Sequence, residues 1–101
     1  MHVIDEIKSE ICSHFNLPPI DMISGRRFRN AGRARQIVMY LAAEMTTATL
    51  KQIGDKLGDR DHTTVRHGIM RIDQLRRSDP TIAADLNAIR ERLKDRLPKV
   101  A

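Results

Sequence analysis

A run of four polar residues, Asp61-His62-Thr63-Thr64, carries side chains that could hydrogen-bond to the edges of nucleic-acid bases. An aspartate accepts from the amino group of cytosine, and a threonine offers a hydroxyl group together with a methyl group that packs on thymine. A histidine ring nitrogen donates or accepts, depending on its tautomer. The alternative is ordinary capping, in which Asp61 and Thr64 only satisfy free amide groups at the start of a helix.

A cluster of arginines is the second feature that could bind a ligand. Five arginines and no acidic residue fall between positions 26 and 35, and their charge equals the whole formal net charge of +5. They are Arg26, Arg27, Arg29, Arg33 and Arg35. A basic segment on an otherwise neutral chain is typical of a phosphate-binding surface, and arginine suits both bidentate phosphate contact and a narrow minor groove. The alternatives are a solvated loop or a patch that binds an anionic membrane surface.

The elements that position these residues are predicted to be helices. Apolar residues recur at helical spacing, and no window alternates with period two, so we expect no sheet. Helices are predicted over residues 3–15 and 33–46, with a short helical turn over 19–23, a short helix capped by Thr49, a helix capped by Asp61, and a last helix that starts at Asp79-Pro80. The charged face of this last helix is expected to be solvated.

Length and composition exclude several classes of protein. The 101 residues, 41% of them hydrophobic, make one domain, 1–101, with a packed core. The single cysteine, Cys12, rules out an internal disulfide and fits a reducing compartment. No apolar run spans a bilayer, and the N-terminus does not read as a secretory signal. His62 and His67 do not share a helical face, so we expect no metal site. We also expect no cofactor and no enzyme activity.

The segment from about 49 to 77 has the outline of a helix-turn-helix. A short helix leads through Gly58 into a second helix that begins with the polar run. In such motifs the first residues of the second helix meet base edges in the major groove. The position of the run therefore favours base reading over capping alone.

These residues carry a resemblance to a known family. The stretch Ile53-Gly54-Asp55-Lys56-Leu57-Gly58-Asp59-Arg60-Asp61-His62-Thr63-Thr64-Val65 closely resembles the signature Ile-Gly-x-x-Phe-Gly-Gly-Arg-Asp-His-Thr-Thr-Val of the C-terminal DNA-binding domain of the bacterial replication initiator DnaA. Arg33-Ala34-Arg35-Gln36 looks like that family's Arg-Pro-Arg-Gln helix start, and Gly25-Arg26-Arg27-Phe28-Arg29 looks like its basic loop, here taken as 24–32. The resemblance covers about residues 3–97. It implies an all-α fold of five to six helices with a Trp-repressor-like helix-turn-helix.

The resemblance also implies roles for single residues. Asp61, His62, Thr63 and Thr64 match the base-reading positions, and Arg27, with Arg26 and Arg29 beside it, matches the minor-groove position. Contacts to the DNA backbone are expected from Arg33, Arg35, Thr46, Thr49, Lys51, Arg60 and Arg66. The implied partner is double-stranded DNA at an asymmetric DnaA box resembling TTATCCACA, bound by a monomer.

The chain departs from the family pattern at several positions. Ala34 replaces a proline, and Ala43 stands where a basic residue is common. Lys51 replaces a proline that touches a base methyl group, and Asp59 replaces the second glycine of the turn. Arg66 stands where an aliphatic residue is usual. These departures leave the exact target sequence open.

No Gly-x-x-x-x-Gly-Lys-Ser/Thr segment occurs in the chain, so no nucleotide binding or ATPase activity is expected. The chain is expected to be either a free-standing domain or a piece of an initiator, in the cytoplasm and associated with the nucleoid. It would bind origin boxes without opening the duplex and so regulate replication initiation. The alternative is a small helix-turn-helix transcription regulator, for example one carried by a prophage.

Overall fold

The computed structural model describes residues 3–24 and 30–97, and within these ranges every regular element is a helix. The five α-helices and one 3₁₀-helix confirm the predicted all-α fold. They are α1 (Val3–Phe15), η1 (Pro19–Met22), α2 (Ala31–Met45), α3 (Leu50–Asp55), α4 (His62–Ser78) and α5 (Pro80–Lys94).

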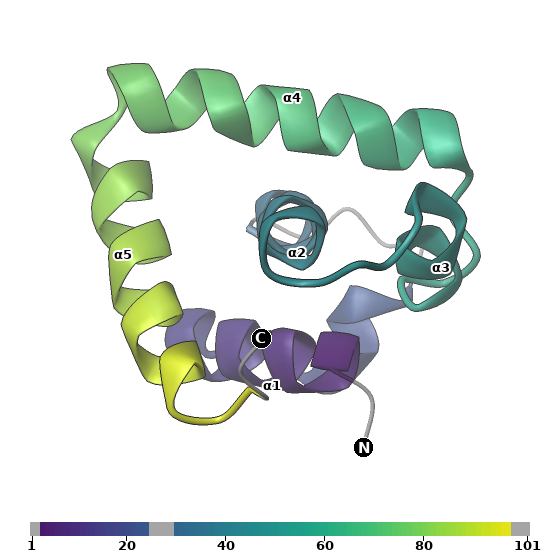
Figure 1. Cartoon of the computed structure of the whole chain (residues 1–101), viewed down its shortest axis with the longest axis horizontal. Coiled ribbons are helices and arrows are strands. Elements are labelled where there is room, and N and C mark those ends of the chain that lie inside the picture. Colours follow the sequence, from purple (N-terminus) through teal and green to yellow (C-terminus); the bar gives the residue numbers. More distant parts are fainter. Residues whose placement is uncertain (1–2, 25–29, 98–101) are drawn as a thin grey trace.

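Helix α2 runs through the middle of the molecule. Figure 1 looks along it and shows α1, α3, α4 and α5 arranged around it like the sides of a frame. Such a position requires apolar residues on most of the circumference of a helix. The sequence of α2 supplies them, since its fully or almost fully buried residues include Ala31, Ala34, Ile37, Val38, Met39, Leu41 and Ala42.

The surrounding helices each turn one apolar stripe toward α2. The stripes have the spacing expected of amphipathic helices, and their buried members form one continuous core. These members are Ile4, Ile7 and Ile11 of α1, Ile53 of α3, Val65 and Ile72 of α4, and Ile82, Leu86, Ile89 and Leu93 of α5.

Three predicted helix starts are confirmed by their caps. The Thr49 side chain accepts from the amide of Gln52 while the Gln52 side chain accepts from the amide of Thr49, which makes a complete capping box. The Asp61 side chain accepts from the amide of Thr64 at the start of α4, and Asp79 accepts from the amide of Thr81 ahead of α5. Proline at position 80 is tolerated because the first amide of a helix has no partner within it.

The start of α2 differs from the prediction. The helix begins at Ala31 rather than Arg33, because Asn30 adopts a left-handed conformation (φ 76°) that turns the chain into the helix two residues earlier. Asparagine tolerates this conformation better than most residues. Ala31 and Gly32 are therefore helical, and the predicted basic loop over 24–32 is too long at its C-terminal end.

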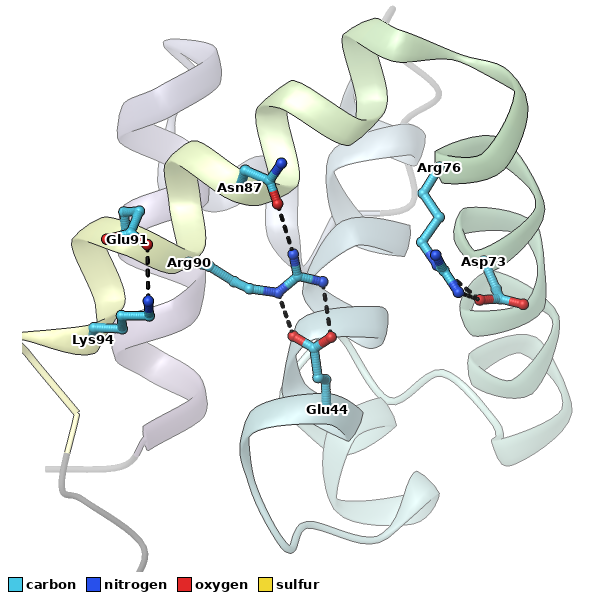
Figure 2. A network of polar contacts seen from close by, with 7 residues as sticks. All are labelled: Glu44, Asp73, Arg76, Asn87, Arg90, Glu91 and Lys94. Atoms are coloured by element: carbon cyan, nitrogen blue, oxygen red, sulfur yellow. Dashed lines mark hydrogen bonds and ion pairs between the residues drawn. The ribbon is translucent and has the colours of Figure 1, made fainter.

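The charged face of α5 was expected from the sequence to be solvated, but its side chains make ion pairs within the fold. Arg90 makes a two-pronged ion pair with Glu44 of α2, with Nε–Oε2 and Nη2–Oε1 distances of 2.6 and 2.8 Å (Figure 2). Arg92 and Arg96 both donate to the buried carboxylate of Glu10 in α1, at 2.8 and 3.2 Å. The Arg90 pair joins α5 to α2 and the Arg92 pair joins it to α1, while Arg96 makes its contact to α1 from just beyond the end of α5.

Gly54 is a glycine whose replacement should damage the fold. A Cβ atom added there would lie 1.9 Å from the carbonyl oxygen of Arg60, a backbone atom that cannot move aside cheaply. We expect Gly54→Ala to lower the free energy of unfolding by about 2 kcal/mol or more, as overpacking against a fixed neighbour does. Urea denaturation followed by circular dichroism measures this.

Gly32→Ala is the matched control for that experiment. A Cβ atom at position 32 meets only the Arg35 side chain, at an ordinary 3.8 Å, and alanine is the better helix former. The control should be as stable as the wild type or slightly more so. Equal stability of the two variants would contradict the close packing of Gly54.

Candidate nucleic-acid interface

Helices α3 and α4 form the helix-turn-helix, and two unusual backbone conformations make the turn between them. Gly58 and Asp59 both have left-handed φ angles, 78° and 57°. Glycine adopts this region freely, whereas aspartate does so at a modest cost. The second glycine of the family pattern is therefore replaced without loss of the turn geometry.

The first turn of α4 exposes the polar run predicted to read bases. Asp61, His62, Thr63 and Thr64 are all exposed, and the side chains of His62 and Thr63 make no hydrogen bond to another described residue. Oδ1 of Asp61 accepts from the amide of Thr64 at 2.8 Å. This backbone hydrogen bond lowers the pKa of the Asp61 carboxyl group, so it is ionised at neutral pH. The Thr64 hydroxyl and the Thr63 amide also interact with this carboxylate, which still has acceptor capacity because a carboxylate offers about four acceptor sites.

Lys51 and Arg66 are exposed cations on either side of this turn. The Lys51 side chain is 81% exposed and pairs with Asp55 at 3.0 Å, one helical turn along α3. Such an exposed pair is weak and easily exchanged for another anion. Arg66 has no hydrogen bond or ion pair to any other described residue. Both side chains can swing toward a phosphate.

Arg33 and Arg35 lie at the start of α2, but their surroundings differ. Arg33 is half-buried and donates to the side chain of Gln36 at 2.8 Å. Arg35 is buried, with 7% of its surface exposed, and Nη1 donates to the carbonyl oxygen of Asp21 at 2.6 Å. Burial lowers the pKa of the Arg35 guanidinium, and the nearby positive charge of Arg60 lowers it further. Arg35 is thus bound into the fold more firmly than a surface phosphate ligand.

Arg60 also makes contacts within the protein. Its guanidinium group donates through Nη1 to the carbonyl oxygen of Leu57 and through Nη2 to that of Ser24, the latter at 3.0 Å. The residue is half-buried. Its side chain is therefore held at the turn between α3 and α4.

The two threonines predicted to contact the DNA backbone both have local roles. The Thr46 hydroxyl donates to the carbonyl oxygen of Ala42 at 2.6 Å and accepts from the amide of Ala48 at 3.0 Å, which ends α2. Thr49 caps α3. Arg26, Arg27 and Arg29 lie outside the described residues, so their predicted minor-groove role stays a prediction.

A hollow of about 250 Å³ between α2 and α4 brings several of these residues together. Arg35 and Arg60 line it with Thr64 and His67. From the sequence, His67 was expected only to be a poor metal ligand, and not to lie at this hollow. The position of His67 beside Thr64 was predictable from the sequence, because His67 follows Thr64 by three positions and so shares its face of α4.

Other kinds of site are not seen in the part of the chain that the structure describes. No three histidine, cysteine or acidic side chains gather to hold a metal ion among residues 3–24 and 30–97. No helix in these ranges is long and apolar enough to cross a membrane. Cys12 is buried, and burial raises the pKa of its thiol, which makes it unreactive.

Comparison with known proteins agrees with this geometry. Residues 4–72 match the model of the family described as bacterial dnaA protein helix-turn-helix. The matched region begins in α1 and ends inside α4, so it includes all of α3, the turn and the first part of α4.

Similar curated proteins are chromosomal replication initiator proteins DnaA. The protein of Roseobacter denitrificans is 42% identical over 92 residues, which are 91% of this chain and 20% of that protein. The proteins of Cereibacter sphaeroides and Sphingopyxis alaskensis are 41% and 43% identical over 90% and 89% of this chain, again with 20% of each relative covered. The chain spans about a fifth of the length of these relatives. It belongs to the helix-turn-helix family found in bacterial DnaA proteins.

Proposed function

We propose that this chain binds double-stranded DNA at DnaA-box-like sites and acts in the initiation of DNA replication. One observation carries the proposal: the first turn of α4 exposes four consecutive polar side chains, while Asp61 satisfies the helix start without using all of its acceptor capacity. Helix-turn-helix proteins place this turn in the major groove. The family match adds support, because the matched segment is a DNA-binding domain rather than the ATPase part of the relatives.

The base-reading step follows from the chemistry of the turn. The Asp61 carboxylate uses its remaining acceptor capacity to accept from a cytosine amino group, and Thr63 supplies a hydroxyl and a methyl group. His62 reaches a base edge as donor or acceptor, since it lies at the first helical position with no competing partner among the described residues. Thr64, beside them, contacts a base or the DNA backbone.

The cations supply affinity and register. Lys51 and Arg66 are free to reach phosphates on both sides of the groove, and Arg33 with Arg35 places positive charge at the start of α2. We propose that Arg26, Arg27 and Arg29 enter the minor groove, as the family resemblance implies. Such contacts dominate affinity and make it dependent on salt.

In our proposal, DNA binding by this chain needs no nucleotide. The curated relatives are about five times as long as the matched segment, and no phosphate-binding loop occurs in this chain. A domain, 1–101, that occupies boxes as a monomer without hydrolysing ATP would compete with a full initiator for the same sites. It would thereby regulate replication.

Fluorescence anisotropy with two labelled duplexes at about 0.15 M salt tests this function. One duplex carries TTATCCACA and the other carries the same bases in scrambled order. We expect tighter binding to the box by about two orders of magnitude or more. Equal, salt-sensitive binding to both duplexes would overturn the proposal.

Replacing His62 by alanine should reduce discrimination and leave non-specific binding intact. The preference for the box should fall about 5- to 100-fold, the range for one good base contact, because the imidazole contact is lost while every cation stays. Titrations of both duplexes measure the ratio. Met70→Ala, an exposed change two turns further along α4, should keep the wild-type preference. An unchanged preference in His62→Ala would refute the base-reading role.

Asp61→Asn should separate base reading from capping. Asparagine caps helices as well as aspartate does, so the denaturation midpoint should stay close to that of the wild type. The amide nitrogen, however, takes the place of the second carboxylate oxygen and presents donors where an acceptor is needed. We expect the box preference to fall at least fivefold, measured by anisotropy. A fall in the midpoint with an intact preference would assign Asp61 to capping alone.

A further inference from the structure

Arg60 is a cation near the proposed interface whose guanidinium group makes its hydrogen bonds within the fold. It lies in the connection between α3 and α4, immediately before the cap residue Asp61. Its two terminal nitrogens donate to different carbonyl oxygens, that of Leu57 within the turn and that of Ser24 from the segment after η1. Its own amide donates to the carbonyl oxygen of Gly54 at 3.0 Å. Arg60 thus holds both ends of the turn and ties it to a distant part of the chain.

The packing of the neighbouring glycines shows how little space this turn has. A Cβ atom at Gly58 would lie 2.2 Å from the carbonyl oxygen of Ile23 and 3.1 Å from Nη1 of Arg60. A Cβ atom at Gly54 would meet the carbonyl group of Arg60 itself. The turn therefore rests directly on the backbone of residues 23–24, and the guanidinium group bridges the two.

We propose that Arg60 is a positioning residue, which fixes the first turn of α4 in the orientation needed for base reading, and not a ligand of a DNA phosphate. This inference rests on the proposed function, because it assigns the base reading to that turn. Base contacts tolerate only small displacements of the side chains that make them. A residue that holds the turn therefore acts on sequence preference rather than on overall affinity.

The fork of the guanidinium group explains why arginine is required at this position. Two separate nitrogens reach two carbonyl oxygens at once, whereas the single ammonium nitrogen of lysine is a point charge that cannot hold both in the same geometry. A phosphate ligand, by contrast, needs mainly the positive charge, which lysine keeps. Arg60→Lys and Arg60→Gln therefore separate the two roles.

We expect Arg60→Lys and Arg60→Gln to lose the same amount of box preference, about tenfold, with little change in binding to the scrambled duplex at about 0.15 M salt. The matched control is Arg71→Lys, an exposed arginine of α4 outside the interface, which should behave like the wild type. If Arg60→Lys keeps the wild-type preference and only Arg60→Gln weakens binding, on both duplexes alike, then Arg60 is a phosphate ligand and the inference is wrong.

A second readout combines Arg60→Lys with His62→Ala. If Arg60 acts by positioning the turn that carries His62, the double variant should lose less preference than the product of the two single losses. Arg66→Gln with His62→Ala should instead show fold-losses in affinity that multiply, since Arg66 is an independent contact. Multiplying losses in box preference for the Arg60 pair would contradict the positioning role.

Hydrogen exchange without DNA keeps this inference testable apart from the proposed function. In Arg60→Lys, which circular dichroism should show to be folded, the amides of Leu57 and Arg60 should exchange faster while those of α1 and α5 do not change. Unchanged exchange at the turn would overturn the anchoring role. If the wild type shows no box preference, the proposed function fails, and the exchange experiment still decides whether Arg60 holds the turn.

Discussion

The close approach of α4 to α2 is the constraint on which the DNA-facing side depends. A Cβ atom at Gly68 would lie 2.3 Å from the sulfur of Met39, so glycine lets the two helices come this near. The contact holds α4 across the central helix, and the first turn of α4 lies beyond it, beside α3 (Figure 1). Exposure of the polar run is therefore a result of helix packing as well as of composition.

Some polar side chains of this region make hydrogen bonds inside the fold, and others stay open to solvent. Asp61 uses one oxygen for the backbone, whereas Arg60 and Arg35 use their guanidinium groups on carbonyl oxygens inside the fold. Lys51 and Arg66 are the cations of this region that keep their freedom to move. The arginines that look equivalent in the sequence thus fall into two kinds, those that hold the fold and those that can reach out.

Features that depend on neighbouring residues were predictable from the sequence. The caps at Thr49, Asp61 and Asp79 and the turn at Gly58 follow from local rules, and the structure confirms them. Contacts between residues far apart in the chain were not predictable from one sequence, because periodicity does not show which helices meet. The burial of Arg35 and the bond from Arg60 to Ser24 are such contacts, as is the pairing of the α5 arginines. The start of α2 was missed for a local reason, the conformation of Asn30. The roles of the individual base-reading residues stay predictions.

The ion pairs of α5 also shape the electric field of the molecule. Arg90, Arg92 and Arg96 are neutralised by Glu44, Glu10 and Glu6, so the far side of the domain presents alternating charges at close range. Such fields cancel within a few ångströms, whereas the unbalanced charge near the start of α2 extends much further. A polyanion at long range would therefore be attracted by the segment 26–35, which carries the net charge of +5, and not by the side that α5 forms.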